Sequence, residues 1–271
     1  MSCMRSHYLF TGTSLVMLFI SLSIVITGCS NRRAAPEEEI MITPSSSYGA
    51  LPDSLLTNAF SATSYSIRTN PHHVVLTGLS DHRLITFYKK SVKKQTRSDD
   101  YYSSYSYYYD EWNSEYDRFF MPGIDLLHGY NLLNVGHYDL KKDTFNYLFD
   151  HPVLVKSVYF PSRIQDSIDN KPINRDYFLL SAYTEDSNAD SLINRKDMRR
   201  FFLFNSDCSQ KLQLVPSEYS VVRSQYDKAN DVMYLFANLD ENKNGQIDKD
   251  EPLHVFWISL KSPIVATQIT P

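Results

Sequence analysis

Short apolar segments separated by polar turns recur from about residue 74 to the end of the chain. They are rich in β-branched and aromatic residues and are bounded by turn-forming residues, a pattern that predicts β-strands. No long apolar stripe with the helical period accompanies them. We therefore expect an all-β domain of antiparallel strands. The expected strands contain Val74–Leu76, Leu132–Val135, Val153–Val155, Tyr177–Leu180, Phe201–Phe204 and Ser220–Val222.

Two acidic, Asn-rich loops, residues 186–197 and 240–251, interrupt this pattern and begin 54 residues apart. Each lies between apolar segments, so we expect strand–loop–strand units with the loops at strand–strand connections. The segment before the second loop, Val232–Leu239, also has apolar residues at the positions that a helix would need. A helix is therefore an alternative to a strand for this segment. The segment after it, Leu253–Leu260, is predicted to be a strand.

A third copy of the unit is predicted near the start of the domain. His73–Leu79 matches the strand before each loop, and Val135–Phe149 matches the hairpin after it, with a long insertion in place of the loop. Repeats of a few antiparallel strands are typical of β-propeller blades, although propellers usually have four blades or more. A partial, propeller-like arrangement, an open curved sheet and a sandwich remain alternatives.

The 240–251 loop has the composition and spacing of a calcium site. It fits the pattern D-x-[DN]-x-[DN]-G-x₅-E at every required position. Ca²⁺ takes six to eight oxygen ligands, and Gly245 suits the sharp turn because glycine tolerates positive φ. The alternative is a solvated polar turn. The expected ligands are side-chain oxygens of Asp240, Asn242, Asn244, Asp248 and Glu251 and the backbone carbonyl of Gln246.

The 186–197 loop repeats this spacing with two weaker positions. Ser191 replaces the glycine at the turn, and Asp197 replaces the final glutamate with a side chain one methylene shorter. We therefore expect one Ca²⁺ in the 240–251 loop, while a second ion or a plain polar turn remains open here. The candidate ligands are Asp186, Asn188, Asp190, the carbonyl of Leu192, Asn194 and Asp197.

Both loops resemble the calcium-binding loop of the EF-hand family. The resemblance covers only the loop residues, because the flanks are mostly strand-like where that family has helices. It implies calcium binding, with an apolar residue at the eighth loop position, Ile193 or Ile247, tying the loop to a core. The ion would then close a long β-hairpin.

The N-terminal residues have the features of a targeting signal. Arg5 is followed by an uncharged apolar run, Tyr8–Thr27, which is long enough to cross a membrane. The run ends in Ile26-Thr27-Gly28-Cys29, which resembles the lipobox of bacterial lipoproteins. The resemblance implies a signal peptide at 1–28, acylation of Cys29 and attachment to the cell envelope, with Ser30 favouring the outer membrane. The alternative is an uncleaved signal anchor.

The remaining chain is large enough for one substantial domain. Residues 1–28 contain one charge, Arg5, so their removal lowers the formal net charge from −4 to −5. A weakly acidic chain is poorly suited to nucleic acid, and we expect no such partner. Cys208 is the one cysteine outside the signal peptide and the predicted lipidation site, so no internal disulfide is expected.

A polar tether is predicted at 29–58 and the β-repeat domain at 59–271. The tether is rich in Pro, Ser and Glu, although Ile40-Met41-Ile42 within it could pair with a sheet. The insertion at about 93–125 holds the Tyr/Ser run Tyr101–Tyr109. Such runs are typical of protein- or glycan-binding surfaces, and the alternative is a low-complexity loop or rings that cover the domain's own sheet.

The common hydrolase and nucleotide-binding motifs are missing from the sequence. We therefore expect a calcium-binding, membrane-anchored lipoprotein that acts as a binding or scaffold module of the cell envelope. A calcium-stabilised hydrolase or lyase is the alternative, because catalytic residues of β folds are scattered along the chain. Whether the protein is an enzyme stays open at this stage.

Overall fold

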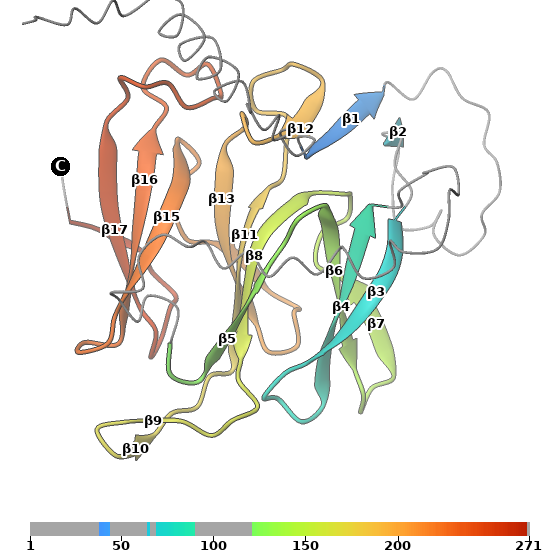
Figure 1. Cartoon of the computed structure of the whole chain (residues 1–271), viewed down its shortest axis with the longest axis vertical. Helices are drawn as coiled ribbons and strands as arrows, with labels where there is room; N and C mark the ends of the chain where they lie inside the picture. Colours follow the sequence, from blue (N-terminus) through green and yellow to red (C-terminus); the bar gives the residue numbers. More distant parts are fainter. Residues whose placement is uncertain (1–37, 44–63, 66–68, 90–120, 270–271) are drawn as a thin grey trace, which may run out of the picture. The chain divides into compact units, whose positions relative to one another are not determined.

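A computed structural model describes residues 38–43, 64–65, 69–89 and 121–269 (Figure 1). These residues form strands and turns, and the predicted all-β class is confirmed. No helix long and apolar enough to cross a membrane occurs among them. Cys29 with its lipobox, and residues 93–120 of the predicted Tyr-rich insertion, lie outside the described residues.

Three antiparallel sheets follow one another along the chain, each built around a four-stranded meander. The first sheet contains β3 (Thr69–Leu76), β4 (His82–Lys89), β6 (Leu132–Asp139) and β7 (Thr144–Tyr147). The second contains β8 (Leu154–Pro161), β11 (Tyr177–Tyr183), β13 (Arg199–Asn205) and β14 (Lys211–Gln213), with β5 (Ile124–His128) added beside β8. The third contains β15 (Tyr219–Asp227), β16 (Val232–Leu239), β17 (Leu253–Ser259) and β18 (Thr267–Gln268).

Shorter strands lie at the margins of these sheets. β1 (Glu39–Thr43) pairs with β12 (Leu192–Asn194) and with β2 (Ser64–Tyr65), and β9 (Ser167–Ile168) pairs with β10 (Lys171–Pro172). β1 lies inside the stretch for which a tether is predicted. Ile40 is completely buried opposite Ile193, so residues 39–43 take the ordered alternative and pair with a loop strand.

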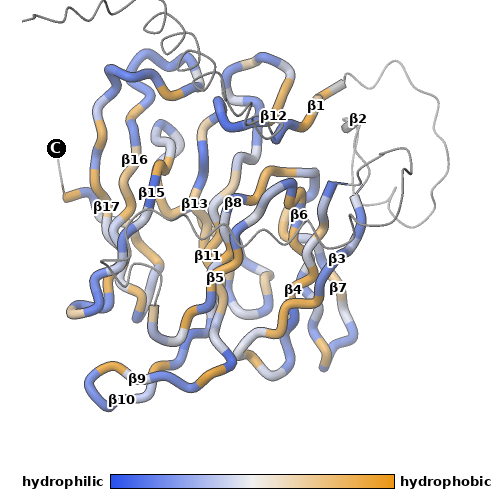
Figure 2. The backbone as a smooth tube through the Cα atoms, viewed as in Figure 1, coloured by the Kyte–Doolittle hydropathy of each residue, from blue (hydrophilic) through white to orange (hydrophobic). Residues whose placement is uncertain are grey.

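The second sheet is buried on both faces, which explains its continuous apolar strands. Leu179 and Phe201 pack against the third sheet, whereas Phe178 and Phe202 pack against the first. Successive side chains of a strand point to opposite faces, so a run without polar residues is what a sheet covered on both sides requires. Hydrophobic residues are concentrated around β5, β8 and β11 of this sheet in Figure 2.

The predicted repeat corresponds to these meanders, but the strand before the insertion was assigned wrongly. It is β4, not His73–Leu79, because residues 73–76 belong to β3, the first strand of the meander. In each meander, the second and third strands are joined by the distinctive segment: the long insertion after β4, the 186–197 loop after β11 and the 240–251 loop after β16. Val232–Leu239, for which a helix was the alternative prediction, is strand β16. Each meander has the strand number of a propeller blade, and two shared apolar clusters stack the three sheets as in a sandwich.

Candidate metal centre

The two predicted calcium loops have the same backbone conformation. The fourth and sixth residues of each loop have positive φ: Ala189 (59°) and Ser191 (68°) in one, Lys243 (58°) and Gly245 (74°) in the other. Positive φ at the sixth position was expected, and Ser191 adopts it at the steric cost that glycine avoids. The sequence repeat is therefore also a repeat of local structure.

The first aspartate of each loop anchors the turn through equivalent hydrogen bonds. Asp240 accepts from the backbone N–H groups of Asn244 at 3.0 Å and Gly245 at 2.9 Å. Asp186 accepts from the N–H groups of Asp190 at 3.0 Å and Ser191 at 2.8 Å. Both aspartates thus curl their loops around a carboxylate, and each of their oxygens keeps a further lone pair.

The third, fifth and twelfth positions also match between the loops. Asn242 and Asn244 accept from the N–H groups two residues further along, as Asn188 and Asp190 do in the other loop. Glu251 accepts from the N–H of the ninth residue, Asp248, at 2.9 Å. The corresponding bond from Asn194 to Asp197 is 2.7 Å long. All six predicted ligand positions of each loop are therefore held within one compact turn.

The side chains of three predicted ligands of the 240–251 loop contact one another. Asp248 Oδ2 lies 2.9 Å from the side-chain nitrogen of Asn242 and 2.8 Å from that of Asn244. The side chains at the third, fifth and ninth positions therefore lie next to one another on the same side of the turn. Each amide and carboxylate oxygen has two lone pairs, so an oxygen that accepts one backbone N–H can still bind a cation.

The final carboxylates distinguish the loops. Glu251 Oε1 is a buried oxygen that has no hydrogen-bond partner, an arrangement that costs free energy unless another group satisfies it. Asp197 Oδ1, by contrast, accepts from Ser187 N at 2.8 Å and lies 3.4 Å from Asn188 N. Asp197 Oδ2 accepts from Asn194 N. Glu251 Oε1 in the 240–251 loop is therefore available to a cation. The corresponding oxygen of the 186–197 loop, Asp197 Oδ1, already accepts two N–H groups.

Asp197 lies in an environment that disfavours charge. Its side chain is buried, and burial raises the pKa of its carboxyl group even though the N–H donors of Asn194 and Ser187 act in the opposite direction. Asn194 Oδ1 accepts one N–H, from Lys196 at 2.7 Å, as the asparagine oxygens of the other loop do. The order of the two loops as calcium sites therefore stays a prediction, and the final carboxylate is where their contacts differ.

The donor set suits an oxygen-seeking cation. Among the described residues, no group of three or more His, Cys, Asp or Glu side chains is placed to hold a metal ion. A site in the 240–251 loop would therefore need the two asparagines and the Gln246 carbonyl beside its carboxylates. Ca²⁺ accepts such mixed oxygen ligands, whereas Zn²⁺ favours Cys and His. The residues present fit Ca²⁺.

The loops lie against each other, which the sequence does not indicate. A Cβ atom on Gly245 would lie 1.8 Å from the backbone oxygen of Ser187, so the backbones of the two loops are too close to leave room for a side chain at residue 245. The Ser187 hydroxyl is 2.5 Å from the Gly245 carbonyl oxygen. A polar cavity of about 390 Å³ beside this contact includes Asp186 and Asp240 in its lining. Ser187 occupies the second loop position, for which the motif predicts no role.

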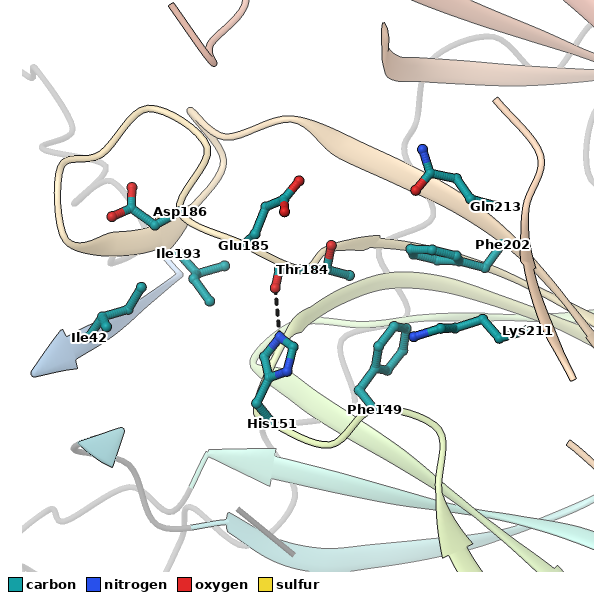
Figure 3. Close-up of a pocket in the computed structure, with 10 residues that line it drawn as sticks. All are labelled: Ile42, Phe149, His151, Thr184, Glu185, Asp186, Ile193, Phe202, Lys211 and Gln213. Atoms are coloured by element: carbon teal, nitrogen blue, oxygen red, sulfur yellow. Dashed lines mark hydrogen bonds between the residues drawn. The ribbon is translucent and has the colours of Figure 1, made fainter. Parts of the chain in front are cut away.

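A larger cleft of about 640 Å³ adjoins the 186–197 loop (Figure 3). Lys211 Nζ lies 5.0 Å from the centre of the Phe149 ring and 5.6 Å from that of Phe202. His151 Nε2 is 2.7 Å from the Thr184 carbonyl oxygen. None of the ten lining residues is Ser or Cys, so the cleft offers rings and charges for binding but no nucleophile of those types.

Comparisons of the chain with protein-family models, with curated proteins and with solved structures gave no match.

Proposed function

We propose that this protein is a calcium-binding lipoprotein of the bacterial cell envelope that acts as a binding or scaffold module. The observation that carries the calcium part is the 240–251 loop, in which Glu251 Oε1 is buried without a hydrogen-bond partner. Asp240, Asn242, Asn244, Asp248, Glu251 and the Gln246 carbonyl would hold the ion. The 186–197 loop is the weaker candidate for a second ion.

Calcium is favoured over magnesium by the number and type of ligands. Mg²⁺ requires near-ideal octahedral geometry and keeps several of its waters, whereas Ca²⁺ accepts six to eight oxygens in flexible geometry. The glutamate at the twelfth position can contribute two oxygens, and among the described residues it accepts a hydrogen bond only from Asp248 N. When bound, the ion would neutralise carboxylates that otherwise repel one another across the turn.

The calcium assignment predicts unequal effects of two conservative substitutions. The full chain in detergent should take up Ca²⁺ in isothermal titration. Glu251→Gln should raise the dissociation constant at least tenfold, about 1.4 kcal/mol, because it removes one charged oxygen from the stronger site. Asp197→Asn should have a smaller effect, since Asp197 already accepts from Ser187 N and Asn194 N. Equal losses, or no uptake by the unsubstituted protein, would contradict the assignment.

The lipoprotein part of the proposal is supported by the sequence before Cys29. Cys29→Ser removes the thiol that would be acylated, so the full-length precursor should accumulate in a bacterial host. Gel mobility and metabolic labelling with palmitate measure this directly, with Cys208→Ser as the matched control. Processing of the Cys29→Ser protein to the size of the unsubstituted one would exclude lipidation at this position.

The proposed attachment is to the outer membrane, through the lipid on Cys29. A protein or glycan partner would bind at the Tyr-rich insertion at about 93–125, whose rings offer contact area at low entropic cost. In this arrangement the calcium ion has a structural role. It would order the connection between β16 and β17 rather than take part in a reaction.

A further inference from the structure

Ser187 connects the two loops through its backbone and its hydroxyl group. Its N–H donates to Asp197 Oδ1 at 2.8 Å, within its own loop. Its hydroxyl lies 2.5 Å from the Gly245 carbonyl oxygen and 3.2 Å from Asp197 Oδ1. A hydroxyl has one proton, so it donates to the nearer carbonyl, while the N–H of Met198 donates to its oxygen at 2.8 Å.

This contact fixes one peptide unit of the 240–251 loop at both ends. The carbonyl of the peptide between Gly245 and Gln246 accepts from Ser187, and the N–H of the same peptide donates to Asn244 Oδ1 at 3.0 Å. The next carbonyl along the chain, that of Gln246, is the expected backbone ligand for calcium. The orientation of the Gly245–Gln246 peptide therefore helps to determine where the Gln246 carbonyl points.

The 186–197 loop can provide this support with protein contacts alone. The two oxygens of Asp197 together accept from backbone donors of Ser187 and Asn194. Strand β12, which lies within the loop, is paired with β1, and Ile193 is buried in that pairing. The loop is thus held at its second, eighth, ninth and twelfth positions by contacts that involve no cation.

We propose that the 186–197 loop supports the 240–251 loop in its calcium-binding conformation, with Ser187 as the positioning residue. The inference rests on the proposed calcium site in 240–251. It adds that contacts with the 186–197 loop hold this site in its binding conformation before the ion arrives. A flexible loop must lose conformational entropy when it binds an ion, and contacts that order it beforehand reduce that cost. A second ion in the 186–197 loop is not required for this role.

The test compares the calcium affinity of the full chain in detergent with that of three serine variants, by isothermal titration with CaCl₂. Ser187→Ala should raise the dissociation constant about fivefold, the factor that corresponds to one hydrogen bond. Ser187→Thr keeps the hydroxyl and should recover most of the affinity. Ser209→Ala is the matched control, because its hydroxyl donates to Asp207 at 2.6 Å in the turn at the other end of β13. Its affinity should equal that of the unsubstituted protein.

Melting curves in chelator separate positioning from general stability. If Ser187→Ala lowers the melting temperature in chelator but leaves the calcium dissociation constant unchanged, Ser187 is only structural and the inference is overturned. If Ser187→Ala does not fold, Asp197→Asn replaces it, and an unchanged dissociation constant for that variant overturns the inference equally. Absence of calcium uptake by the unsubstituted protein would instead overturn the proposed function, and this inference with it.

Discussion

Gly245→Ala is expected to raise the calcium dissociation constant at least tenfold and to lower the free energy of unfolding by about 1–3 kcal/mol. Two effects act together. Gly245 has φ of 74°, which a residue with a side chain adopts at a cost, and its added Cβ would lie 1.8 Å from the Ser187 backbone oxygen. A backbone oxygen cannot rotate away, so the two loops would have to separate.

Ser191→Gly is the matched control for this substitution, because Ser191 holds the sixth position of the other loop with φ of 68°. Relief of the left-handed strain contributes about 1–2 kcal/mol, and the entropy of glycine in the unfolded chain removes about 0.4–1 kcal/mol. Ser191→Gly should therefore be neutral or slightly stabilising. Urea unfolding with calcium and with chelator measures both variants. A Gly245→Ala protein that retains its stability and its response to calcium would refute the close-contact argument.

Asp231→Ala is expected to lower the free energy of unfolding by about 3–5 kcal/mol, because it leaves the charge of Arg175 buried without its partner. The guanidinium of Arg175 donates to Asp231 Oδ1 at 2.7 Å and to Oδ2 at 3.0 Å. The two side chains are 2% and 3% exposed. Arg175 also donates to the carbonyls of Leu260 and Pro122, so it ties the segments before β11 and β16 together.

Asp176→Ala is the control for the Asp231 prediction. Asp176 is exposed and adjacent to Arg175 in the chain, and its removal should change stability by no more than about 0.5 kcal/mol. The Asp231 effect should be the same with calcium and with chelator. Arg175 precedes β11, whereas the 186–197 loop follows that strand, so the pair and the loops lie at opposite ends of the second sheet. Urea unfolding that shows equal losses for both variants would contradict a buried pair.

The strands and the loop turns could be predicted because their causes are local. Phe201–Phe204 is apolar at every position, which requires a strand covered on both faces, and β13 is such a strand. The positive φ of Gly245 follows from the loop motif alone. In both cases the residue type and its neighbours decide the conformation, so a single sequence contains the information.

The contact between the loops could not be predicted, because it depends on how two sheets pack. Ser187 occupies a loop position that the motif leaves open, and serine in an acidic turn suggests only a solvated hydroxyl. The pairing of Ile40 with Ile193 is similar, since it joins residues 153 positions apart along the chain. A short apolar triplet in a polar stretch fits a tether as well as an edge strand until its partner is known.

Strand β1 also limits how far the folded domain can lie from a lipid anchor. Glu38 accepts from Arg195 at 2.8 Å and is buried, so the chain is fastened to the domain at that residue. Eight residues lie between Cys29 and Glu38, so even a fully extended chain places these two residues at most about 32 Å apart. A tether ending at residue 58 would reach about 100 Å. With Cys29 acylated, the 186–197 loop, which pairs with β1, would be restricted to the zone close to the bilayer surface.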